Sequence, residues 1–190
     1  MNERKKFIDT PSQTAGPFLH IGCTPRIAGI DIFRSELGQT PFEEITDNEA
    51  INIKGKIYDG NNEPIIDAMI ETWQCDANGN YSSNQGFARI VTDFKTGEYQ
   101  LKTIRPGNKI NKDGSLSASY ITFWIVARGM NRPLITRMYF LENDLKNDLM
   151  LNSIKIEDRL NTLIPYTEDK KNFVFNIYLQ GKKETIFFDF

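Results

Sequence analysis

The chain has 190 residues, enough for one domain with a sizeable core, and its 23 basic and 25 acidic side chains leave a net charge of −2. Nearly balanced charge gives no overall attraction to nucleic acid or to an anionic membrane surface, and no stretch approaches the roughly 18 apolar residues of a membrane-spanning helix. We therefore expect no nucleic-acid partner and no membrane partner. No apolar export segment follows the basic first residues, and the two cysteines are too isolated for a disulfide framework, so we expect a cytoplasmic protein.

The stretch at residues 10–22 carries two prolines, two glycines and the chain's single histidine. Such a polar, Pro- and Gly-broken composition is typical of a loose terminal arm, yet Phe18, Leu19 and Ile21 give this stretch something to bury. We expect residues 1–47 to form an N-terminal arm and connector, and residues 48–190 to form the folded domain.

The domain itself contains six short β-type runs separated by Gly, Pro, Asn and Asp. This pattern predicts an all-β fold, an antiparallel β-sandwich or barrel, and we favour the sandwich. The first run closes on Asp59-Gly60, a hairpin signal because these residues tolerate positive φ, and the run at 119–129 is apolar enough for a central strand buried on both faces. Mixed helical spacing at 144–164 predicts one or two short helices. The six runs lie at 51–60, 64–76, 96–107, 119–129, 133–140 and 172–181.

The single histidine excludes the His-rich zinc, iron and copper sites, because these need two or more imidazoles. A serine–histidine relay through His20 has no supporting motif around any serine, so we interpret His20 as structural. No phosphate-binding loop or dinucleotide fingerprint is present. We interpret Cys23 and Cys75 as buried structural thiols.

Arg128 ends the apolar run "FWIVA" and is followed by Gly129, which lets a ligand or another backbone approach closely. A guanidinium at the end of a buried strand needs an anion. Its planar fork can hold a carboxylate with two hydrogen bonds, which makes Arg128 a candidate receptor for an acidic substrate. A salt bridge to one of the chain's own acids, internal or at an interface, is the competing interpretation.

Six segments in order along nearly the whole chain carry a resemblance to a known family. They read "TPSQTAGPFLHIG", "IETWQCDANGNY", "TIRPG", "IVARG", "TRMYF" and "ETIFFDF". Together they resemble the intradiol ring-cleaving dioxygenases, and within that family the α-type subunits. The resemblance implies a β-sandwich subunit that pairs with a homologous β subunit in a larger hetero-oligomer.

Iron-bearing members of this family hold Fe(III) with two tyrosines and a His-x-His pair. Carried across by position, Tyr81 matches the first tyrosine, Lys109 or a neighbour stands at the second, and Tyr120 and Thr122 replace the histidines. The resemblance therefore implies no metal ligands in this chain and Fe(III) bound by the partner β subunit. Tyr81 is interpreted as a packed remnant.

The implied reaction is cleavage of protocatechuate by O₂ between its two hydroxylated carbons, giving 3-carboxy-cis,cis-muconate. In this family the α subunit's arm and one arginine line the pocket above the partner's iron. The matching residues are Thr14, Gly16, Pro17 and Arg128, as substrate-binding and not catalytic groups, with Arg128 receiving the substrate carboxylate.

A non-catalytic prealbumin-like β-sandwich interaction module is the alternative, because residues 55–74 also match the strand, turn and strand that open many such modules. The arm and the apolar tail distinguish the two, since a generic module needs neither. An exposed tail of Phe187, Phe188 and Phe190 would form an apolar patch, so we expect these rings to be buried.

Overall fold

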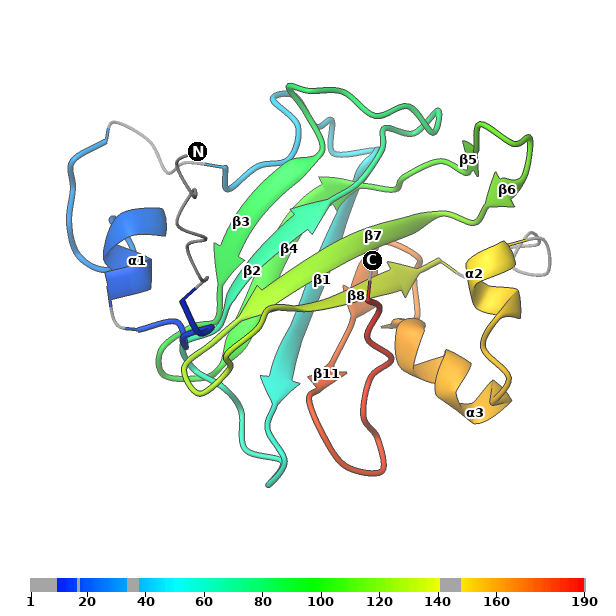
Figure 1. The fold of residues 1–190 in the computed structure, drawn as a ribbon. Helices are drawn as coiled ribbons and strands as arrows, with labels where there is room; N and C mark the ends of the chain where they lie inside the picture. Colours follow the sequence, from blue (N-terminus) through cyan, green and yellow to red (C-terminus); the bar gives the residue numbers. More distant parts are fainter. Residues whose placement is uncertain (1–9, 17, 34–37, 141–147, 190) are drawn as a thin grey trace, which may run out of the picture.

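A computed structural model describes residues 10–16, 18–33, 38–140 and 148–189. Two main β-sheets pack face to face, with helix α1 (Phe18–Cys23) at one side of the molecule and helices α2 (Leu149–Asn152) and α3 (Glu157–Leu160) at the other (Figure 1). The expected antiparallel β-sandwich is therefore confirmed in its architecture.

The first sheet is antiparallel throughout and has the strand order β3-β2-β7-β8. Its strands are β3 (Phe87–Val91), β2 (Met69–Trp73), β7 (Tyr120–Val126) and β8 (Leu134–Tyr139). Strand β3 was not among the predicted runs: it is a short edge strand whose place is set by pairing with β2 and not by a long apolar pattern of its own.

The second sheet is built around β1 (Ala50–Tyr58), which pairs antiparallel with β4 (Glu98–Ile104) along one edge. Along its other edge β1 pairs in parallel, first with β10 (Asn172–Val174) and then with β11 (Ile177–Tyr178). These parallel pairs depart from the expected antiparallel pattern, because β10 and β11 follow β1 only after β2 to β9 and are not joined to it by a hairpin. Strand β9 (Tyr166–Thr167) pairs antiparallel with β10. Strands β5 (Lys109–Ile110) and β6 (Leu116–Ser117) form a separate hairpin.

The turn after β1 differs from the predicted hairpin. Asp59 Oδ1 accepts hydrogen bonds from the amides of Asn61 and Glu63, and the residue with positive φ is Asn62, at 62°, not Gly60. Only an isolated bridge from Tyr58 to Pro64 continues the pairing, since the next strand, β2, belongs to the other sheet.

The core lies between the two sheets and follows the two-residue period of the strands. In β7 the side chains of Ile121, Phe123 and Ile125 are fully buried. On the other face Tyr120 is buried, whereas Thr122, Trp124 and Val126 are half-buried, so the predicted burial on both faces holds only at the start of the strand. The opposite sheet contributes Ile53, Ile57, Tyr99, Leu101, Phe173, Phe175 and Ile177.

The helical region expected at 144–164 contains α2, α3 and a 3₁₀ turn, η2 (Asn161–Leu163), which confirms that expectation from residue 148 onward; residues 144–147 lie outside the described part. Asp148 caps α2, because its Oδ1 accepts from the amides of Met150 and Leu151. Of the helices within the described ranges, none is long and apolar enough to cross a membrane.

The tail lies alongside β8, the edge strand of the first sheet, where Phe188 forms an antiparallel bridge with Ile135. Phe187 packs against the main core and Phe188 against a smaller cluster around Tyr139 and Leu163. Both rings are half-buried, and Phe190 lies outside the described residues.

Candidate functional site

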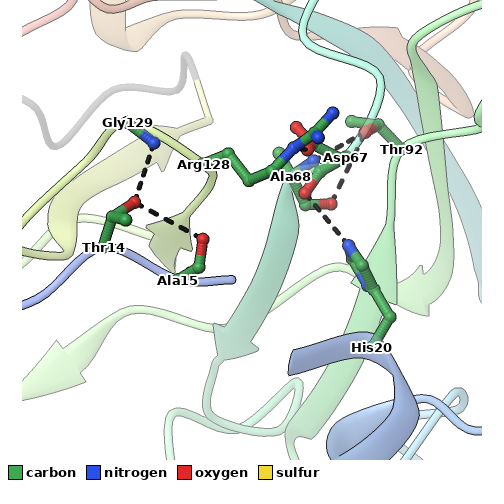
Figure 2. A network of polar contacts seen from close by, with 8 residues as sticks. All are labelled: Thr14, Ala15, His20, Asp67, Ala68, Thr92, Arg128 and Gly129. Atoms are coloured by element: carbon green, nitrogen blue, oxygen red, sulfur yellow. Dashed lines mark hydrogen bonds and ion pairs between the residues drawn. The ribbon is translucent and has the colours of Figure 1, made fainter. Parts of the chain in front are cut away.

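The arm is folded against the end of β7. Thr14 Oγ1 accepts a hydrogen bond from the Gly129 amide at 2.7 Å and can donate to the Ala15 carbonyl at 3.4 Å (Figure 2). Helix α1 starts directly afterwards, with the Leu19 amide donating to the Gly16 carbonyl at 3.0 Å. This helix was not predicted, because its six residues are too few to show a helical period.

His20 fastens α1 to the sandwich. Its ring is 8% exposed, and Nε2 lies 3.1 Å from the carbonyl oxygen of Asp67. Since a carbonyl only accepts, Nε2 carries a proton in this contact, and Nδ1 faces the Thr24 hydroxyl at 3.4 Å. The ring also meets Phe94 edge to face, with centroids 5.5 Å apart. These contacts give His20 the structural role predicted for it.

Arg128 has an anionic partner within this chain. Its Nε donates to Oδ2 of Asp67, whose side chain is 15% exposed, whereas the Arg128 side chain is 65% exposed (Figure 2). Among the described residues the guanidinium is bonded through Nε alone. The internal salt bridge considered from the sequence is therefore present, and the outer end of the guanidinium is left open to solvent.

A hollow of about 340 Å³ lies where the arm, α1 and the end of β7 meet. Gly16 and Arg128 both line it, together with apolar side chains that include Leu19, Ile66 and Phe94. A Cβ atom added at Gly16 would meet nothing within 4 Å, so open space lies beside this backbone. Of the four predicted site residues, the structure gathers Thr14, Gly16 and Arg128 in one place, and Pro17 lies outside the described residues.

The positions that the resemblance matches to iron ligands also come together, in a different place. The Tyr81 hydroxyl hydrogen-bonds the Tyr120 hydroxyl at 3.3 Å, and Lys109 Nζ lies 5.0 Å from the centre of the Tyr81 ring. The Arg137 guanidinium lies 4.1 Å above the ring of Tyr120, and Arg137 stands opposite Thr122 in the β7–β8 register. Two cationic side chains thus accompany the two phenols.

This donor set does not fit a ferric ion. Burial, followed by the hydrogen bond to Tyr120, raises the pKa of Tyr81 well above its ordinary value of 10.0, and burial raises that of Tyr139 to about 12 although Arg137 opposes the shift. Metal-binding tyrosinates must be deprotonated, and the raised pKa of Tyr81 opposes that deprotonation. The matching positions also carry no imidazole, since Tyr120 and Thr122 stand where iron-bearing members have histidines. No group of three or more His, Cys, Asp or Glu that could hold a metal occurs in the described parts of the chain.

Two residues of these clusters were not singled out from the sequence. Asp67 is an acid within the apolar stretch 64–70, which is a usable signal for a paired charge. Arg137 gave no such signal, because alternation in β8 is compatible with an outward-facing arginine. The prediction of two buried thiols was right for Cys75 and wrong for Cys23, which is half-buried at the exposed end of α1.

Comparisons with known proteins agree on one family. The family model described as "Dioxygenase" matches residues 34–181. The chain is 37% identical to the protocatechuate 3,4-dioxygenase alpha chain of Pseudomonas putida, with 96% of each chain covered. It is 30% identical to the corresponding alpha chain of Burkholderia cepacia, over 95% of this chain and 96% of that one. It is 27% identical to the beta chain from B. cepacia, over 48% of this chain and 45% of that chain.

Solved structures support the same fold at lower identity. Catechol 1,2-dioxygenase from Pseudomonas arvilla C-1 matches with a TM-score of 0.59 and 18% identity, over 75% of this chain and 55% of that one. An intradiol ring-cleavage dioxygenase from Tetranychus urticae matches with a TM-score of 0.55 and 16% identity, over 74% and 91%. A common β-sandwich fold would not by itself explain a family-model match over residues 34–181 or 37% identity to the P. putida relative over 96% of each chain. The chain belongs to the intradiol ring-cleavage dioxygenase family.

Proposed function

We propose that this chain is the α subunit of a protocatechuate 3,4-dioxygenase, lining the substrate pocket above a ferric ion held by a homologous β subunit. The observation that carries the proposal is the contact between the arm and the end of β7, where Thr14 and Gly129 are hydrogen-bonded beside Arg128. The names of the P. putida and B. cepacia relatives support the same assignment.

The three described residues have distinct parts in this proposal. Arg128 uses its open outer end to bind the carboxylate of protocatechuate, since a guanidinium holds a carboxylate through two parallel N–H groups. Gly16 offers bare backbone against which an aromatic ring can lie. Thr14 holds the arm at its place on β7. This chain's contribution is positioning, with the catechol hydroxyls directed toward the partner.

The iron supplies binding of the catecholate and its activation toward O₂, and the product is 3-carboxy-cis,cis-muconate. We place the iron in the partner because the matching positions here carry hydrogen-bonded phenols beside lysine and arginine. The side chains of Lys109 and Arg137 are half-buried, and their positive charges repel a trivalent cation.

The test is Arg128→Leu in the reconstituted α–β complex, assayed by oxygen uptake with protocatechuate and with catechol. Hydrogen bonds to a charged group contribute about 1.5–3 kcal/mol, so KM for protocatechuate should rise about tenfold to a hundredfold. Catechol lacks the carboxylate, and its KM should stay nearly constant. Equal loss with both substrates would show that Arg128 serves the fold and not the substrate.

A further inference from the structure

We propose that Asp67 is a positioning residue for substrate binding, which orients the Arg128 guanidinium so that its outer end meets the substrate carboxylate. This inference rests on the proposed function, in which Arg128 is the carboxylate receptor. It adds a residue that neither the sequence nor the resemblance singled out.

The guanidinium of Arg128 has two separate edges that can each bind an anion. Asp67 engages Nε, at the inner edge of the planar group, and among the described residues no other contact holds it. The two terminal nitrogens, Nη1 and Nη2, form the opposite end, and their spacing matches the two oxygens of a carboxylate. Asp67 and a substrate carboxylate can therefore bind Arg128 at the same time.

Asp67 is well placed to act as the fixed member of the pair. The backbone carbonyl of Asp67 accepts a hydrogen bond from His20 Nε2 at 3.1 Å. The next residue, Ala68, is hydrogen-bonded to Thr92, which directly follows β3. The Ala68 amide donates to Thr92 Oγ1, and the Thr92 amide donates to the Ala68 carbonyl, each at 3.0 Å. With its backbone held on both sides and its side chain 15% exposed, Asp67 presents its carboxylate in one direction. Figure 2 shows the Arg128 side chain extending away from Thr14 and Gly129 and ending beside Asp67.

Arg128, by contrast, has a long side chain with many rotamers, and this side chain is exposed to solvent. Its side chain is 65% exposed, and an exposed arginine loses much rotamer freedom when it binds a ligand. A prior bond to Asp67 limits that loss, because the guanidinium is already oriented before substrate arrives. The backbone next to Arg128 is fixed as well, through the bond between Gly129 and Thr14.

The test compares Asp67→Ala and Asp67→Asn in the reconstituted α–β complex. Asp67→Ala should raise KM for protocatechuate about tenfold, the scale of one lost hydrogen bond to a charged group, with kcat and the KM for catechol nearly unchanged. Asp67→Asn keeps an oxygen that accepts from Nε and should recover most of the loss. Asp47→Ala is the matched control, because it also removes one carboxylate from an ion pair, at 3.6 Å from Lys102, on the other sheet.

The same change in the Arg128→Leu background separates positioning from direct action. If Asp67 acts through Arg128, Asp67→Ala adds nothing further once the guanidinium is gone. An unchanged or lowered KM for protocatechuate in Asp67→Ala overturns the inference, as does an equal loss with catechol. Where Asp67→Ala does not assemble, Asp67→Asn decides, with a smaller loss confined to protocatechuate expected.

The two proposals fail in different ways. If Arg128→Leu shows no selective loss of protocatechuate, the proposed function itself is wrong. If Arg128→Leu shows that loss and the Asp67 variants do not, only the positioning role of Asp67 is wrong.

Discussion

Cys75 lies beneath the loop at Gly107, where its thiol donates to the Gly107 carbonyl at 3.4 Å. Burial raises the pKa of this thiol above its ordinary value of 9.0, so the reactive thiolate is scarce at neutral pH. Cys23, at the end of α1, is half-buried and accessible in part. The two thiols therefore differ in accessibility, which the sequence did not indicate.

A thiol reagent such as DTNB should therefore modify Cys23 first. In the folded chain we expect one fast equivalent, and a second only after unfolding in urea. Cys23→Ser should remove the fast phase, and Cys75→Ser should leave it intact. Equal rates for both thiols in the folded chain would contradict the burial of Cys75.

Sequence alone could predict that Thr14, Gly16 and Arg128 lie near one another, because each stands in a segment that resembles the family; their role in substrate binding stays a prediction. It could not predict that Asp67 pairs with Arg128, since 61 residues separate them and only the pairing of β2 with β7 brings them together. It also gave two alternatives for the anion at Arg128. The structure contains the internal salt bridge to Asp67, and the exposed outer end of the Arg128 guanidinium leaves room for a substrate carboxylate as well.

Strand β1 contains a break in its parallel edge, between β10 and β11. Here the Phe175 carbonyl approaches Gly55, where an added Cβ would lie 1.9 Å from that oxygen. The Tyr99 hydroxyl donates to the same carbonyl at 2.5 Å, and the Lys56 amide donates to the Asn176 side chain at 3.0 Å. The missing backbone pairing is thus replaced by two side chains, and the replacement requires glycine at 55.

Gly55→Ala should lower the free energy of unfolding by about 3 kcal/mol, the upper part of the range for single substitutions, because backbone must move to admit the methyl group. Urea denaturation of the chain, or of the complex, measures the effect. Gly22→Ala is the matched control, since nothing lies within 4 Å of its added Cβ. A Gly55 variant as stable as wild type would show that this close approach is absent.

At the scale of elements, the long alternating runs were predictable and the pairings were not. The alternation of β1 and the continuous apolar and aromatic run of β7 are visible in the sequence, and β4 and β8 lie in short runs bounded by Gly or Pro. The short elements β3 and α1 depend on partners elsewhere in the chain. Strand β3 pairs with β2, and α1 is held by the contact between His20 and the Asp67 carbonyl. Local pattern cannot encode a contact whose other half is 47 residues away.

The whole molecule presents two separate clusters, one at the arm and Arg128 and one around Tyr81 and Tyr120. In the proposed function only the first faces substrate. The second holds the phenols of Tyr81 and Tyr120 beside the cationic side chains of Lys109 and Arg137. An α–β complex would then carry its iron on the β side alone.

The purified chain should accordingly bind no stoichiometric ferric iron and show no tyrosinate-to-iron absorption in the visible range. After reconstitution with the homologous β chain, metal analysis should find one iron per α–β pair, and oxygen uptake with protocatechuate should appear. A coloured and active preparation of this chain by itself would refute the assignment.

The parallel edge of β1 has a consequence for the order in which the fold is completed. Lys56 meets Asn176 across 120 residues of chain, and at about 5–20 residues per second a ribosome needs on the order of ten seconds to add them. During that interval β1 can pair with β4, but its other edge exposes unsatisfied amides and carbonyls, the kind of edge that recruits strands from other chains. Pairing with residues 172–178 covers this edge of β1 and removes it as a template for strands of other chains.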